Sequence, residues 1–286
     1  MRLPTLLLAV AALTTTVFAS TPLDAARQLY TERKDAEAKT AFEALVRAEP
    51  RQAEAVFYLG RLAMRARDAD AAVKHFEKAI ELDGKKSAYH LELAGAYGAK
   101  IQSAGLFGKA SLASKSRTAL EKAVELDPTS VDARFGLVQF YSQAPSLMGG
   151  GLDKAHLQAD AIVQMDPARG RIAKAGLFAR EKKYDEAFAL YEDALKASPD
   201  DYNTLYQIGR LAAESGERLD RGLETLKLCL GMTPPANAPG HAAANWRTGN
   251  ILEKQGDKAA ARTAYEASLA LDPKFESALA SLKKLN

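Results

Sequence analysis

The sequence has little of what a catalytic or metal-binding protein usually shows. It has one cysteine, Cys229, so no disulfide can form within the chain. Its four histidines are scattered and none shows the His-x-x-x-His spacing of a metal site. The glycine-rich stretches 105–111 and 149–151 lack both a preceding strand and the Lys-Ser/Thr pair of a phosphate-binding loop. We therefore expect no metal, no cofactor and no catalytic residue.

An excess of one sign of charge is also missing. Lys and Arg total 39 against 36 Asp and Glu, which gives a formal net charge of +3. Charges of both signs are interspersed along the chain, whereas a nucleic-acid-binding face usually gathers basic residues into a patch. We expect no nucleic-acid partner.

Long hydrophobic runs are confined to the N-terminus. Arg2 precedes an apolar run at residues 6–13, and Val17 and Ala19 place small residues at the −3 and −1 positions of a cleavage site. The run is shorter than the roughly 20 residues that a membrane-spanning helix needs. These features predict a signal peptide at residues 1–19, no stable membrane insertion after its cleavage, and a periplasmic or, alternatively, secreted protein.

A short apolar stripe recurs along the rest of the chain. Within residues 53–84, Ala72, Phe76 and Ala79 lie at i, i+4 and i+7, one face of a helix, and Gly84 follows. The same spacing, ended each time by proline, occurs six more times: Ala38, Phe42 and Leu45; Ser116, Leu120 and Ala123; Ala155, Ala159 and Ile162; Ala187, Tyr191 and Ala194; Gly222, Leu226 and Cys229; Ala261, Tyr265 and Ser268. The breakers recur after 34, 44, 39, 32, 35 and 39 residues. A fixed period of this size indicates a repeat protein.

This pattern resembles the tetratricopeptide repeat family. The resemblance implies an all-α fold, a right-handed superhelical array of antiparallel helix pairs with about seven repeats and a C-terminal capping helix. After the signal peptide at 1–19 we predict an array over 20–286, with repeats at about 20–52, 53–86, 87–130, 131–167, 168–201, 202–234 and 241–273, and a capping helix at 274–286. Gly60, Gly209 and Gly249 share one position of the first helix, which predicts that the second helix crosses closely there. Val138 breaks this rule and suggests a splayed fourth pair.

Two repeats carry extra residues. In repeat three they lie within 100–112, so its second helix is predicted to begin at about Ala113, and in repeat four they lie within 143–153. Both inserts are expected as loops that project from the same edge of the array. Their apolar side chains either pack on each other or form a second candidate binding surface made of Leu106, Phe107, Leu147 and Met148.

The resemblance also implies that the fifth and ninth positions of each first helix face a concave groove. These positions give the candidate binding residues Phe57, Arg61, Phe135, Gln139, Tyr206, Arg210, Trp246 and Asn250. Repeats three and five place Leu91 with Gly95 and Ile172 with Gly176 there instead. Aromatic and Arg side chains are enriched at binding hot spots, although the aromatics could equally fill the space between repeats. No lysine stands at the fifth position, so the family's clamp for a terminal carboxylate is not matched.

These observations favour a non-enzymatic protein–protein interaction scaffold or adaptor in the bacterial cell envelope, binding a protein or peptide segment in its groove. The alternative is an envelope assembly or accessory factor that binds a glycan or other polymer chain by stacking on the aromatics. Arg61, Arg180, Arg210 and Arg247 favour an acidic peptide over a glycan. The sequence does not identify the partner.

Overall fold

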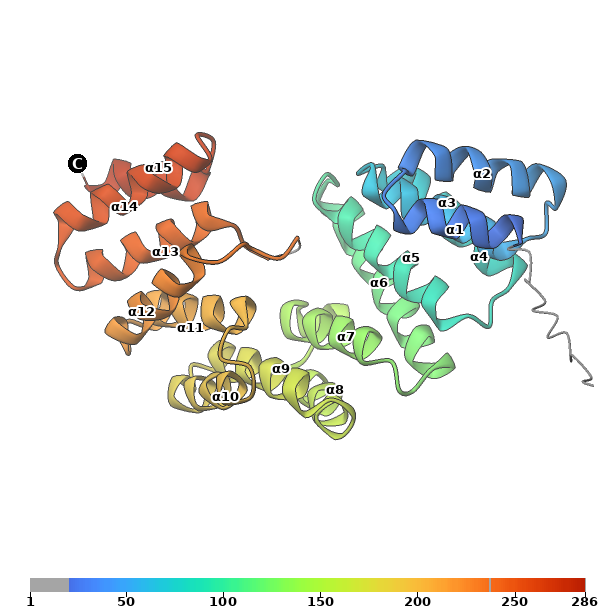
Figure 1. Cartoon of the computed structure of the whole chain (residues 1–286). Helices are drawn as coiled ribbons and strands as arrows, with labels where there is room; N and C mark the ends of the chain where they lie inside the picture. The colour runs from blue at the N-terminus through green and yellow to red at the C-terminus, as the bar shows by residue number, and fades with distance from the viewer. Residues whose placement is uncertain (1–20, 237, 286) are drawn as a thin grey trace, which may run out of the picture. The chain divides into compact units, whose positions relative to one another are not determined.

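The computed structural model describes residues 21–236 and 238–285, which fall into two compact units divided between Lys100 and Ile101 (Figure 1). These residues form fifteen α-helices and one short 3-10 segment, and no strand occurs among them. The predicted all-α repeat array is confirmed. The predicted signal peptide at 1–19 lies outside the described residues, and the hand of the superhelix stays an expectation.

The first unit holds the helices coloured blue to teal in Figure 1. Their bounds are α1 Pro22–Thr31, α2 Asp35–Ala48, α3 Ala53–Arg65, α4 Ala69–Leu82 and α5 Ser87–Ile101. From α1 to α4 each helix packs on the next one along the chain. Ala38 and Phe42 of the predicted stripe are fully buried in this packing, as are Ala72 and Phe76.

The second unit continues the same succession of helices. Their bounds are α6 Leu106–Leu126, α7 Val131–Gln143, α8 Leu152–Met165, α9 Pro167–Arg180, α10 Tyr184–Ala197, α11 Tyr202–Ser215, α12 Leu219–Leu230, α13 His241–Lys254, α14 Lys258–Leu271 and α15 Glu276–Leu285. Each helix packs on its successor, and α7 with α9 and α11 with α13 also touch. The last helix, α15, packs on α14 at the place of the predicted capping helix.

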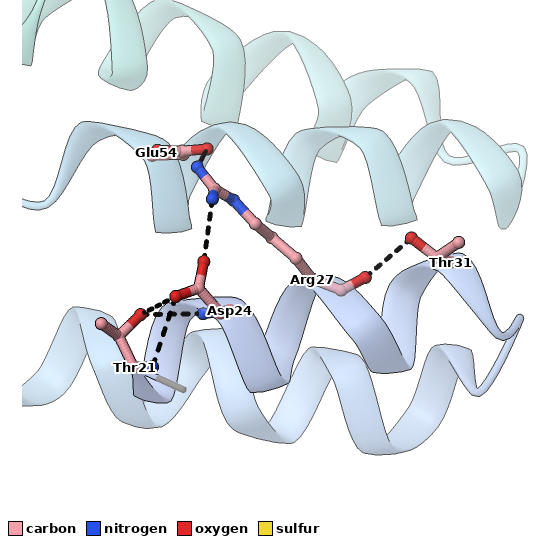
Figure 2. A network of polar contacts seen from close by, with 5 residues as sticks. All are labelled: Thr21, Asp24, Arg27, Thr31 and Glu54. Atoms are coloured by element: carbon pink, nitrogen blue, oxygen red, sulfur yellow. Dashed lines mark hydrogen bonds and ion pairs between the residues drawn. The ribbon is translucent and has the colours of Figure 1, made fainter. Parts of the chain in front are cut away.

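Hydrogen bonds fix the start of α1 and join it to α3 (Figure 2). The hydroxyl of Thr21 accepts from the backbone N–H of Asp24, and the Asp24 carboxylate accepts from the backbone of Thr21, which completes a capping box. Arg27 bridges Asp24 on its own helix and Glu54 on α3. The hydrogen bonds from Thr21 lower the pKa of the Asp24 carboxyl. The first helix therefore has both a defined beginning and a polar tie to the next repeat.

The close crossings predicted from glycine are confirmed. At each of the three positions, an added Cβ would overlap the side chain in the middle of the second helix's stripe. The pairs are Gly60 with Phe76 at 2.5 Å, Gly209 with Leu226 at 2.4 Å, and Gly249 with Tyr265 at 2.4 Å. Only a residue without a side chain lets a large stripe residue approach so closely.

The fourth helix pair is not splayed, contrary to the expectation from Val138. Val138 of α7 is buried, and the stripe residue at the equivalent position of α8 is Ala159, which is also buried. Other repeats place Phe, Tyr or Leu at that position. A larger residue on the first helix thus accompanies a smaller one on the second, and the pair packs closely with a similar total volume.

The insert of repeat three is helical rather than a loop. α6 begins at Leu106, not at about Ala113, and only residues 102–105 separate it from α5. The residues from Leu106 to Ala113 include two Leu, two Ala and one Lys, which are strong helix formers, with Gly108 as the one poor one. The loop prediction was wrong because it counted the extra residues without weighing their propensity.

The insert of repeat four forms a tight turn. A 3-10 segment at Ser146–Met148 leads into Gly149, which has a left-handed backbone with φ 84°. The Gly149 Cα lies against the Arg117 guanidinium of α6, where an added Cβ would come within 2.1 Å. This contact packs the insert onto the neighbouring helix.

Candidate functional site

A groove of about 610 Å³ lies within the second unit. First helices α7, α9 and α11 line it, and Tyr191 of α10 reaches it from the second-helix layer. Its polar lining residues are Gln139, Ser142, Gln143, Arg180, Gln207, Arg210 and Glu214, and its main apolar ones are Phe135, Val138, Ile172 and Leu177. The predicted concave face of the first helices is thus hollowed at three successive repeats.

Gly176 and Tyr191 determine the depth of the groove. Gly176 occupies the ninth position of its repeat and has no side chain, while the ninth-position residues Gln139 and Arg210 on the adjacent first helices are long. The Tyr191 hydroxyl lies 3.9 Å from the position that a Cβ on Gly176 would take. Tyr191 is only 2% exposed, and burial raises the pKa of its hydroxyl while the Arg210 guanidinium opposes that increase. A neutral hydroxyl therefore lies beneath Gly176.

Positive charge predominates in the groove wall. Glu214 lies between two guanidiniums, with Arg210 Nη1 at 3.2 Å and Arg247 Nη2 at 3.1 Å from its carboxylate oxygens. Arg210 Nε also donates to Gln207 Oε1 at 2.7 Å. Arg180 at the end of α9 is exposed and adds a further guanidinium to the lining. The charged residues of the lining are Arg180, Arg210 and Glu214, and one carboxylate does not balance two guanidiniums, so the groove suits an anionic group.

Three of the eight candidate residues meet in this groove. Phe135 and Gln139 of α7 and Arg210 of α11 line it together with Ile172 and Gly176, the same repeat positions in α9. These equivalent repeat positions of α7, α9 and α11 therefore share one groove. The part that these residues play in binding stays a prediction.

Phe57 and Tyr206 are corrections to the expected site. They are only 7% and 5% exposed, so neither ring faces a partner. Phe57 stacks on Tyr89 of α5 with ring centroids 4.5 Å apart, and Tyr206 belongs to the core formed by α9 to α13. These two rings fill the space between repeats, which is the alternative that the sequence left open. Arg61, one turn after Phe57, pairs with Glu92 at 3.3 Å.

Trp246 and Asn250 serve the C-terminal end of the array instead of the groove. Trp246 Nε1 donates to the Ser281 hydroxyl of α15 at 3.1 Å, and its ring meets Phe275 edge to face. Asn250 Oδ1 lies 2.9 Å from the Tyr265 hydroxyl of α14. Trp246 therefore contacts α15, and Asn250 contacts the second helix of its own repeat.

The second candidate surface is exposed at Phe107 and Leu147, and these two side chains do not contact each other. Phe107 is 91% exposed and Leu147 is 99% exposed, so these side chains do not pack on each other. Met148 is half-buried, and the side chain of Leu106 lies outside the described part of the chain. The expectation that the two inserts pack through their apolar side chains is wrong for Phe107 and Leu147.

Sequence reasoning missed Tyr191, Gln143 and Gln207 as groove residues, and it named Arg180 only among the arginines that favour an acidic peptide. Tyr191 belongs to a second helix, which the repeat alignment assigns to the core. One signal in the sequence pointed to it: a glycine at the ninth position of the same repeat as a stripe tyrosine. Such a pair leaves no side chain between the polar end of the stripe residue and the groove.

Comparison with known families identifies the repeats. Models described as tetratricopeptide repeat match residues 23–97 and 148–202, and a further one matches residues 242–275. The chain belongs to the tetratricopeptide repeat family. The family fold supports a general role as a protein-interaction scaffold. No curated protein matches the sequence.

Solved structures agree with this assignment at the level of fold. A tetratricopeptide repeat protein from Parabacteroides merdae is 16% identical, with a TM-score of 0.71, and the match covers 92% of this chain and 97% of that one. A tetratricopeptide repeat protein of Thermus thermophilus is 21% identical, with a TM-score of 0.51, over 73% of this chain and 97% of that one. At such identities the likeness shows the fold alone.

Other kinds of site find little support in the described residues. No group of three or more His, Cys, Asp or Glu there is placed to hold a metal ion. None of the helices described is long and apolar enough to cross a membrane. Cys229 is buried, and burial raises the pKa of its thiol to about 12, so it is protonated at neutral pH and is not a nucleophile.

Proposed function

We propose that this tetratricopeptide repeat protein is a non-enzymatic scaffold that holds a peptide segment of a partner protein in the groove of α7, α9 and α11. The observation that carries the proposal is the groove itself, about 610 Å³ in volume and lined by three successive first helices. This volume is within the range of ligand sites in proteins.

The amide side chains of the groove suit a peptide backbone. Gln139 and Gln143 lie one helical turn apart on α7, and Gln207 belongs to α11. Each amide group both donates and accepts hydrogen bonds, and every non-proline peptide unit presents one donor and one acceptor. A bound backbone left without such partners would lose about 1–3 kcal/mol for each buried group. The groove can satisfy an extended segment along its length.

The alternative of a glycan or other polymer held by stacked aromatics is less well supported. Phe57 and Tyr206 are buried in the core, and Trp246 packs on α15. Phe135 is the candidate aromatic that remains in the groove. A single ring gives no stacking platform for successive sugar units.

We test the peptide-binding proposal with a random dodecapeptide library displayed on phage and selected against the chain. Peptides that bind should lose at least tenfold in affinity for the variant Gln139→Ala with Gln207→Ala, measured by fluorescence anisotropy. The control is Lys196→Ala on α10, an exposed residue outside the groove lining. Selected peptides that bind the double variant normally would show that the groove is not the site.

An envelope location is part of the proposal, supported by the arginine, apolar run and small-residue site in residues 1–19. The expected mature protein begins at or near Ser20 in the periplasm, or is secreted. Intact-mass measurement of protein recovered from the periplasmic fraction tests this. A mass that retains residues 1–19 would contradict cleavage.

A further inference from the structure

The groove has one place where a ligand side chain can reach the second-helix layer. On the proposed function of peptide binding, we propose that the space over Gly176 is a subsite for one acidic side chain, Asp or Glu, of the bound segment. Arg210 and Arg180 would bind its carboxylate, and the Tyr191 hydroxyl would donate to it from below.

The shape of the subsite follows from one missing side chain. On the flanking first helices, Gln139 and Arg210 occupy the ninth repeat position and project long polar groups, whereas α9 has Gly176 there. Nothing except the Tyr191 hydroxyl, at 3.9 Å, approaches the position of an added Cβ. The result is a gap between two polar side chains with a hydroxyl at its base.

The positive charge around the gap favours a negatively charged side chain as its occupant. Arg210 and Arg247 share the single carboxylate of Glu214, and Arg180 lines the same groove. Arg210 donates through Nε to Gln207 and through Nη1 to Glu214, and it also hydrogen-bonds the Tyr191 hydroxyl, while a guanidinium has five N–H donors in all. Donors therefore remain for a carboxylate, which guanidinium groups bind in a fork geometry. A basic occupant would meet uncompensated positive charge, and a neutral one would leave these donors without an anionic partner.

The subsite is specific to repeat five. Repeat three also has glycine at the ninth position, Gly95 on α5, but no atom lies within 4 Å of an added Cβ there. The equivalent stripe residue of repeat three is Leu120, which has no polar atom. Gly95 therefore provides a matched control for a substitution at Gly176.

The test uses the same dodecapeptide library and the full chain. We expect the selected peptides to share an acidic residue at one fixed position. Changing that residue to its amide, Glu to Gln or Asp to Asn, should weaken binding at least tenfold at low salt and less at high salt.

Substitutions locate the acidic residue within the groove. Gly176→Leu fills the gap and should weaken the acidic peptide at least tenfold, and the acid and amide peptides should then bind equally. Gly95→Leu should leave both affinities unchanged. Circular dichroism should show both variants as helical as the parent, because leucine favours a helix more than glycine does.

Three outcomes would overturn the proposal, and they are distinguishable. If no selected peptide depends on Gln139 and Gln207, peptide binding in the groove fails and the subsite fails with it. If the peptides depend on the groove but show no acidic preference, the subsite is wrong and the proposed function stands. If Gly176→Leu keeps the full difference between acid and amide peptides, the carboxylate is bound elsewhere.

Discussion

Repeats two and five have the same internal spacing but use their concave faces differently. In repeat two, the stripe residue Phe76 is fully buried, and Phe57 packs near it with ring centroids 5.6 Å apart. In repeat five, the stripe residue Tyr191 ends in a hydroxyl that approaches the open position above Gly176. The comparison teaches that the residues at the fifth and ninth positions, rather than the repeat itself, decide whether the concave side is closed or accessible.

The largest expected effect is a loss of stability in repeat two, whose concave side is closed by buried aromatic rings. Phe76→Ala removes a fully buried ring and should cost about 3–5 kcal/mol in the free energy of unfolding. Tyr191→Phe, the counterpart in repeat five, removes one hydroxyl and keeps the ring, so its cost should stay below about 1.5 kcal/mol. Urea denaturation followed by circular dichroism measures both. Equal losses would show that the Tyr191 hydroxyl contributes as much to stability as the whole Phe76 ring, which would contradict its place at an open position.

A second comparison sets the groove against the edge surface. Gln139→Ala with Arg210→Ala should weaken a groove-selected peptide by more than tenfold, about 2 kcal/mol or more, because truncated polar anchors leave their partners unsatisfied. Phe107→Ser with Leu147→Ser should leave the same peptide unaffected, since both residues lie outside the groove lining. Fluorescence anisotropy gives the affinities. Binding that survives the first change and fails after the second would move the site to the edge.

Glycine substitutions sharpen the difference between the two repeats. Gly60→Ala places a Cβ 2.5 Å from the buried Phe76 ring and should destabilise the chain by about 1–3 kcal/mol. Gly176→Ala meets only the Tyr191 hydroxyl at an ordinary contact distance, so improved helix propensity should stabilise it by up to about 1 kcal/mol. Thermal unfolding of the two variants provides the comparison. A stabilised Gly60→Ala variant would show that the crossing is looser than described.

The smallest expected effect is a pH dependence of the first unit. Burial lowers the pKa of His75 on α4 below its ordinary value of 6.5. The folded state therefore binds fewer protons than the unfolded state below about pH 6.5, so stability is complete above that value and declines as the pH falls from it through the lowered pKa of the folded state. His75→Asn should flatten this part of the stability profile. Urea titrations between pH 5 and 7.5 measure it, and an unchanged slope in the variant would exclude His75 as the cause.

Much of the fold followed from the spacing of residues along the chain. The stripe of small and large apolar residues predicted the second helices, and Gly60, Gly209 and Gly249 predicted the crossings that the structure shows. Within the candidate site, Phe135, Gln139 and Arg210 line one groove, and their part in binding stays a prediction. These features depend on helical periodicity, which can be read from the spacing of apolar residues in the sequence.

Which candidate residues are buried and which line the groove depended on contacts between repeats, and the sequence does not show these contacts. The repeat pattern assigns Phe57 and Tyr206 the same position as Phe135, yet the first two are buried against adjacent repeats and the third lines a groove. Trp246 contacts α15 and lies outside that groove. The sequence by itself determined the repeats, their helix pairs and their close crossings. The tertiary structure decided which concave positions stay open, because that depends on the size of side chains brought together from different repeats.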